Sequence, residues 1–113
     1  MSILESSYIA FHLIPFYTNA RKQVVKTPKL YFYDTGLLCH LLGIRTVEAL
    51  VAHPKFGDIF ENLIIAETMK QHLNANQEPQ LFFYRDASKV EVDLLDFTDP
   101  NHRLMIEIKS GQT

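Results

Sequence analysis

Hydrophobic and charged residues alternate near the end of the chain, in the pattern of strands that bury one face. Residues 90–95 and 104–109 both show this alternation, and the polar stretch 98–101 between them has the composition of a turn. We therefore expect two neighbouring strands. If their aliphatic faces are buried together, their charged faces coincide, which gathers Asp93, Glu107 and Lys109 on one side of the sheet.

A longer hydrophobic pattern precedes these strands and has the period of a helix. Between residues 58 and 74, hydrophobic side chains recur at steps of three and four, at Ile59, Leu63, Ala66, Met69 and Leu73. The pattern predicts one long helix with a single buried face.

Glu61, near the start of that helix, has two interpretations. Asp58 and Glu61 have the spacing of a capping box, in which Glu61 only satisfies backbone amides at the helix end. Alternatively, Glu61 projects from the first turn toward Asp93 and Glu107 and contributes to a site there. The spacing alone favours the structural interpretation.

Shorter patterns predict the remaining elements. Runs of aliphatic and aromatic residues predict strands over 8–14, 30–33 and 81–85. Short apolar runs predict helices over 37–42 and 47–51. These helices should begin after Asp34 and Thr46, which can cap them, and end before Gly43 and Pro54.

Composition limits the class of protein. The 113 residues are 47% hydrophobic and 21% charged, so one modest domain, or parts of two small ones, can form a packed core. A net charge of -2 provides no overall basic field, so nucleic acid would have to bind a local patch. The chain has one cysteine, no signal peptide and no long apolar run. We therefore expect a soluble, cytoplasmic protein that does not span a membrane.

One local basic patch is present between the first two predicted strands. Residues 17–29 contain no acidic residue and carry four of the eleven basic ones, Arg21, Lys22, Lys26 and Lys29. An exposed hairpin tip of this kind can contact phosphate groups or an acidic protein surface. A solvated loop explains the same composition equally well.

The acidic residues of the two C-terminal strands suggest chemistry. Two neighbouring carboxylates such as Asp93 and Glu107 repel unless one is protonated or a cation lies between them, and Mg²⁺ is a hard cation that prefers oxygen ligands. A nearby amine such as Lys109 lowers the cost of charge on an attacking water. This is an outline of phosphodiester hydrolysis. Glu-x-Lys alone is a weak motif, and the signal lies in its context of strands and a preceding helix. The histidines show no metal-ligand spacing, and one cysteine leaves no basis for a structural zinc site.

These residues resemble a known superfamily. Glu61 on a helix, Asp93 on a strand and Glu107-Ile108-Lys109 on the next strand resemble the PD-(D/E)xK, or restriction-endonuclease-like, phosphodiesterases. More specifically, the segments 29–37, 60–62, 84–86, 91–93 and 106–110 resemble domain of unknown function 4143, a C-terminal domain attached to AAA-type ATPases in bacteria and archaea.

The resemblance implies a fold and roles for individual residues. It implies an α+β or α/β fold in which residues 55–113 form the nuclease-like core of a helix and three strands, while residues 1–54 form a winged-helix-like hairpin with short helices. Asp93, Glu107 and the carbonyl of Ile108 would bind Mg²⁺, Lys109 would assist the attacking water, and Glu61 would be an auxiliary acid. The basic residues of 17–29 would form the wing, which could lie on DNA or on the ATPase module.

Two departures from the family pattern are visible. The chain contains no Gly-x-x-x-x-Gly-Lys-Ser/Thr motif, so we expect the ATPase module to be absent and ATP not to bind. The chain also ends before the helix and strand that close the superfamily core. We therefore expect a fragment that is inactive alone and that forms dimers or larger oligomers through an uncovered sheet edge.

Three functions remain open at this point. The first is Mg²⁺-dependent cleavage of nucleic acid in the whole protein. The second is a non-catalytic accessory domain that serves assembly of the ATPase or nucleic-acid binding. The third is a structural segment whose charged face is only solvated. We take the ATPase-associated nuclease-like domain as the working hypothesis.

Overall fold

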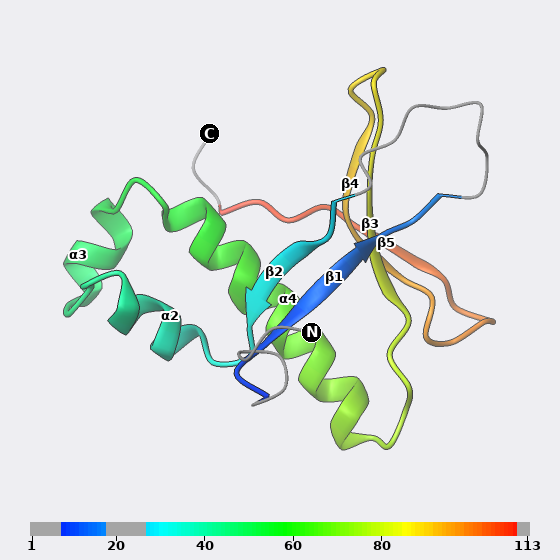
Figure 1. Cartoon of the computed structure of the whole chain (residues 1–113), viewed down its shortest axis with the longest axis horizontal. Coiled ribbons are helices and arrows are strands. Elements are labelled where there is room, and N and C mark those ends of the chain that lie inside the picture. Colours follow the sequence, from blue (N-terminus) through cyan, green and yellow to red (C-terminus); the bar gives the residue numbers. More distant parts are fainter. Residues whose placement is uncertain (1–7, 18–26, 111–113) are drawn as a thin grey trace.

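A five-stranded sheet runs through residues 8–17 and 27–110, which are the residues that the computed structural model describes (Figure 1). The strand order is β2-β1-β3-β4-β5. Strand β1 pairs antiparallel with β2 and parallel with β3, and the pairs β3/β4 and β4/β5 are antiparallel. The strands are β1 (Ala10–Pro15), β2 (Lys29–Phe32), β3 (Leu81–Arg85), β4 (Glu91–Asp96) and β5 (Leu104–Ile106).

Three helices lie in this part of the chain: α2 (Thr35–Leu41), α3 (Val47–Ala52) and α4 (Phe56–Asn74). Figure 1 shows the long helix α4 crossing behind β1 and β2. The hydrophobic core contains side chains from four strands and from α4, namely Phe11, Leu13, Tyr31, Ile65, Ala66, Leu81, Phe83 and Leu94. Helix α4 therefore packs against one face of the sheet, and the prediction of a mixed α and β fold is confirmed.

Local sequence signals placed the short elements correctly. The Asp34 carboxylate accepts a hydrogen bond from the Leu37 amide at 3.3 Å and caps α2. Thr46 Oγ1 accepts one from the Ala49 amide at 3.0 Å and caps α3. Gly43 has a φ of 77°, which suits a residue without a side chain just beyond a helix end. The antiparallel pairing of the first two strands is also confirmed.

The start of α4 corrects one prediction. The helix begins at Phe56 with Lys55 in the capping position, and no side chain caps it. Asp58 therefore lies within the first turn and is exposed, with its Oδ2 3.8 Å from the Lys55 ammonium. The predicted capping box of Asp58 and Glu61 is wrong, because the helix begins before Asp58.

The buried face of α4 also differs from the predicted one. Ile59, Asn62, Ile65 and Ala66 are buried, whereas Leu63 and Leu73 are 39% and 45% exposed. A polar residue, Asn62, occupies the centre of the buried face. The predicted face is right at Ile59 and Ala66, which are buried, and at Met69, which packs against the core. It missed Asn62 and Ile65, which are buried in place of Leu63 and Leu73.

The end of β5 and the predicted domain boundary also need comparison with the structure. Strand β5 ends at Ile106, so Glu107, Ile108 and Lys109 follow the strand instead of continuing it to 109 as predicted. Strands from both sides of the predicted boundary at 54/55 join one sheet, and the division into 1–54 and 55–113 stays a prediction. Among the described residues, no helix has the length and apolar character needed to cross a membrane.

Candidate functional site

A register shift in the sheet decides where Asp93 points. Phe82 pairs with Leu95, but Tyr84 pairs with Val92, so Phe83 faces both Asp93 and Leu94. Such a bulge disturbs the alternation of side chains along the strand. Leu94 belongs to the core against α4, and Asp93 lies close enough to Glu61 of α4 to raise the pKa of that carboxyl. The prediction that Asp93 and Leu94 take opposite faces is wrong for this reason.

The Asp93 carboxylate contacts the segment that follows β5. Its Oδ2 accepts a hydrogen bond from the Ile108 amide at 2.8 Å. This bond brings Asp93 against the backbone of the Glu107-Ile108-Lys109 motif. It also occupies one carboxylate oxygen of Asp93 with a partner from the protein.

The side chains of Glu107 and Lys109 take a different direction. They are 74% and 77% exposed, and the Lys109 ammonium lies 3.9 Å from Glu107 Oε1. Ile106 and Ile108, which alternate with them, pack against the core. The backbone of this motif therefore approaches Asp93, while its two charged side chains point into solvent.

Glu61 lies on the α4 side of the sheet, half buried. Burial raises the pKa of the Glu61 carboxyl, and Asp93 raises it further, whereas the Lys29 ammonium and the Tyr31 hydroxyl lower it. The net effect is a pKa above the ordinary value of a glutamate. Of the two interpretations of Glu61, the structure thus supports the one in which it faces Asp93.

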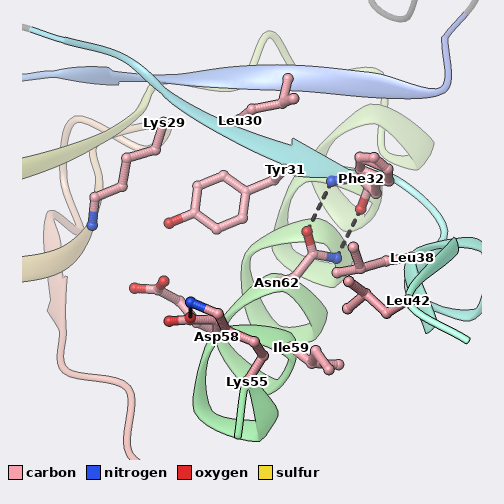
Figure 2. A pocket seen from close by; sticks show the side chains of 11 residues that line it. Lys29, Leu30, Tyr31, Phe32, Leu38, Leu42, Lys55, Asp58, Ile59 and Asn62 are labelled. Carbon is pink, nitrogen blue, oxygen red and sulfur yellow. Dashed lines mark hydrogen bonds and ion pairs between the residues drawn. The ribbon is translucent and has the colours of Figure 1, made fainter. Parts of the chain in front are cut away.

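Two residues of β2, Lys29 and Tyr31, complete the surroundings of Glu61. Figure 2 shows both side chains on the same side of β2, in a pocket that Asp58 and Glu61 also line. The Lys29 ammonium lies 4.8 Å from the centre of the Phe83 ring. Tyr31 is 4% exposed, and burial followed by the charge of Glu61 raises the pKa of its hydroxyl.

The sequence pattern predicted Lys29 to belong to a nucleic-acid patch and indicated no role for Tyr31. Both residues can be placed at Glu61 only once β2 is known to lie beside α4. The other residues of that patch, Arg21, Lys22 and Lys26, lie outside the described residues. Their predicted role is therefore neither supported nor opposed by the structure.

The residues predicted to bind Mg²⁺ do not form a complete set of ligands as they are placed. Among residues 8–17 and 27–110, no group of three or more His, Cys, Asp or Glu side chains is arranged to hold a metal ion. The charges of Asp93 and Glu61 interact with each other, but the Glu107 carboxylate is exposed to solvent. The arrangement thus lacks the convergence of carboxylates that a Mg²⁺ site requires.

Comparisons with known proteins place the chain in a family. Residues 56–113 match the model of "Domain of unknown function (DUF4143)", and residues 1–48 match that of "Domain of unknown function (DUF8612)". Two curated relatives, uncharacterized proteins Mb2031c of Mycobacterium bovis and Rv2008c of Mycobacterium tuberculosis, are each 33% identical over 94 residues, covering 83% of this chain. The chain spans 20% of the length of these relatives.

No solved structure matches the chain significantly. The first family model covers slightly more than half of the chain, from the beginning of α4 through the Glu107-Ile108-Lys109 motif. The chain therefore belongs to the family described as domain of unknown function DUF4143.

Proposed function

We propose that this chain is a nuclease-like domain of a longer, ATPase-containing protein and that Glu61, Asp93, Glu107 and Lys109 belong to a site for hydrolysis of nucleic acid phosphodiesters. The observation that carries the proposal is the 2.8 Å hydrogen bond between the Ile108 amide and Asp93 Oδ2. It joins the strand that bears the aspartate to the Glu-x-Lys segment, while Glu61 approaches the same aspartate from α4.

The roles of the protein groups follow from their positions. Burial raises the pKa of Glu61, so this carboxyl holds a proton more readily than an exposed glutamate does. Lys109, an exposed cation beside Glu107, supplies positive charge to an incoming phosphate or to a water that attacks it. Asp93 orders the segment that carries both residues. Because the carboxylates do not assemble a metal site as placed, we assign no step to Mg²⁺ and treat a metal requirement as a matter for experiment.

The wider setting is part of the same proposal. We further propose a PD-(D/E)xK-like core with a winged-helix-like hairpin, attachment to an AAA-type ATPase, a homo-oligomeric state and a cytoplasmic location. The chain spans a fifth of the length of its relatives, which leaves room for an ATPase module in the longer protein. Helix α4 followed by β3, β4 and β5 has the order expected for the nuclease-like core. The antiparallel β1/β2 pair supports the proposed hairpin, whose wing, residues 17–29, lies mostly outside the described residues.

A second candidate, a non-catalytic accessory domain, is favoured by one specific observation. The Glu107 and Lys109 side chains point into solvent and lie 3.9 Å apart as an ion pair, so they neutralise each other at the surface. A domain that uses this fold only for assembly of the ATPase or for capture of nucleic acid needs no further convergence of these groups.

Cleavage by the whole protein separates the two candidates. Labelled DNA and RNA are incubated with the whole protein while Mg²⁺ or Mn²⁺ is titrated, and the rate is compared for Asp93→Asn, Lys109→Ala and the control Glu91→Gln. Glu91 is an exposed acid on the same strand, and its carboxylate pairs with Arg85 at 3.0 Å. We expect the first two variants to lose about a hundredfold in rate and the control to keep it. Metal-dependent cleavage that survives in all variants, or no cleavage at all, supports the accessory domain.

A further inference from the structure

The Tyr31 hydroxyl lacks a hydrogen-bond partner although it is buried. Among the residues that the structure describes, it is the one side-chain polar atom with under 1 Å² exposed and no hydrogen bond. An unsatisfied buried group of this kind destabilises the native state, so it is rare in folded proteins. Because the oxygen is closed to solvent, an external ligand does not reach it, and its working partner has to come from the protein.

Glu61 is the group that can serve as this partner. The two residues line the same pocket, and the charge of Glu61 raises the pKa of Tyr31. The hydroxyl and the carboxylate interact across this pocket, since each shifts the pKa of the other, and a closer approach of the glutamate side chain would complete a hydrogen bond. A hydroxyl that donates to a carboxylate forms a charge-assisted bond, which is stronger than a neutral one.

Lys29 approaches the same carboxylate from the same strand. Residues two apart on a strand share a face, so Lys29 and Tyr31 both point toward α4, while Leu30 between them is 47% exposed. The Lys29 ammonium rests over the Phe83 ring at 4.8 Å and acts on Glu61 through its charge. Glu61 thus has a donor and a cation on one side, both from β2, and Asp93 and Asp58 as acidic neighbours.

An asparagine fixes this arrangement. Asn62 follows Glu61 on α4, and Phe32 follows Tyr31 on β2. The Phe32 amide donates to Asn62 Oδ1 at 2.8 Å, and Asn62 Nδ2 donates to the Phe32 carbonyl at 3.0 Å (Figure 2). Asn62 Nδ2 also donates to Thr35 Oγ1 at 3.0 Å. These bonds set the register of β2 along α4. They therefore determine that Tyr31 lies beside Glu61 and not a turn away.

We propose that Tyr31 and Lys29 are positioning residues for Glu61, so that β2, which lies outside the matched segment 56–113, holds this carboxylate toward Asp93. The expected effect of Tyr31 and Lys29 on catalysis rests on the proposed function. Their expected effect on the Glu61 carboxylate does not depend on that function. Strand β2, from the N-terminal part of the chain, would then complete a site whose acidic residues all lie in the matched segment 56–113.

The test uses the whole protein and reads Glu61 directly. The carboxyl carbons of glutamate are labelled with ¹³C, the signal of Glu61 is identified by its loss in Glu61→Gln, and its pH titration is followed. The variants are Tyr31→Phe, Lys29→Met, the conservative Lys29→Arg, and the control Tyr84→Phe, which removes a hydroxyl that bonds to Asp86 elsewhere. Thermal unfolding is measured for each variant.

The expected results separate a positioning role from a structural one. Tyr31→Phe and Lys29→Met should move the titration of Glu61 to higher pH, because each removes a group that favours the charged carboxylate. Lys29→Arg keeps the positive charge, so Glu61 should titrate as in the parent protein. Tyr84→Phe should also leave the Glu61 titration unchanged. The thermal unfolding of each variant should remain a single transition, so that a shift in the Glu61 titration is not the result of a lost fold.

A Glu61 titration that is the same in Tyr31→Phe and Lys29→Met as in the parent protein overturns the inference. If the whole protein cleaves nucleic acid, these two variants should also lose about tenfold in kcat with little change in KM. Absence of cleavage removes the proposed function but leaves the titration to decide the role of β2.

Discussion

The His72 imidazole, in the last turn of α4, lies with its Nε2 2.7 Å from Oδ2 of Asp96 at the end of β4. Its other ring nitrogen, Nδ1, lies 2.7 Å from Gln77 Oε1. Both ring nitrogens thus face acceptor oxygens, and only the protonated imidazole can donate to both. This contact joins the C-terminal end of α4 to the end of β4, whereas Glu61 lies near the other end of the helix.

The first prediction concerns the dependence of stability on pH. The contact with Gln77 raises the pKa of His72, burial opposes it, and Asp96 adds to the rise. A group whose pKa is raised on folding stabilises the native state fully below its unfolded value of about 6.5. That contribution is lost as the pH rises through the folded value. We expect the free energy of unfolding to fall over this range in the parent protein.

His72→Gln should remove this pH dependence and cost about 1–3 kcal/mol below pH 6. The matched control is His102→Gln, since the His102 side chain is 78% exposed and its pair with Asp99 is at the surface. Denaturant unfolding at a series of pH values measures both. A parent protein that gains stability from pH 6 to 8 would contradict the assignment.

The second prediction concerns the asparagine that links β2 to α4. Asn62 is 3% exposed and makes three hydrogen bonds, two of them to the Phe32 backbone. Asn62→Ala leaves partly buried backbone groups of Phe32 without these partners and should cost about 2–4 kcal/mol. Asn74→Ala, at an exposed position of the same helix, should cost much less. Equal losses in chemical denaturation would show that the link does not hold the strand.

The third prediction compares two neighbouring positions on α4. Ile65 is fully buried and Leu63 is 39% exposed, although the hydrophobic pattern alone favours Leu63 as the core residue. Ile65→Ala should destabilise the protein by about 2–5 kcal/mol, because it leaves a cavity against the sheet. Leu63→Ala should cost under about 1.5 kcal/mol. A reversed order of the two losses would mean that α4 is rotated about its axis relative to the structure.

Asp34, Thr46 and Gly43 show which features the sequence could predict. Each acts on backbone groups within four residues of itself, so its effect can be inferred without knowledge of the rest of the fold. The order of α4 and the three following strands was predictable for a similar reason. Each of these elements has its own period of hydrophobic residues.

Asn62 and Asp93 show what the sequence could not reveal. Asn62 is buried because β2, thirty residues earlier, presents its backbone to it, and no local pattern encodes that partner. Asp93 turns toward α4 because β3 and β4 differ in register by one residue around Phe83. The predicted gathering of Asp93 with Glu107 and Lys109 assumed strict alternation in both strands, which the register shift and the early end of β5 remove.

The last prediction separates two roles of Asp93, order and charge. Its Oδ2 accepts the Ile108 amide hydrogen at 2.8 Å, so Asp93→Ala removes the acceptor. A hydrogen bond to a charged group contributes about 1.5–3 kcal/mol, so the Ile108 amide should exchange with solvent at least about tenfold faster in this variant. Asp93→Asn keeps an acceptor oxygen but loses the charge, and should retain most of the protection. Hydrogen exchange resolved to residues 104–110 in the whole protein measures this difference.

Combining this measurement with cleavage gives the role of the carboxylate. If Asp93→Asn protects Ile108 but abolishes cleavage, the negative charge itself is required, because the ordered segment is still in place. If Asp93→Asn cleaves as fast as the parent and only Asp93→Ala fails, Asp93 acts by ordering the Glu107-Ile108-Lys109 segment. Unchanged exchange of Ile108 in Asp93→Ala would show that the contact on which the proposed site depends does not form in solution.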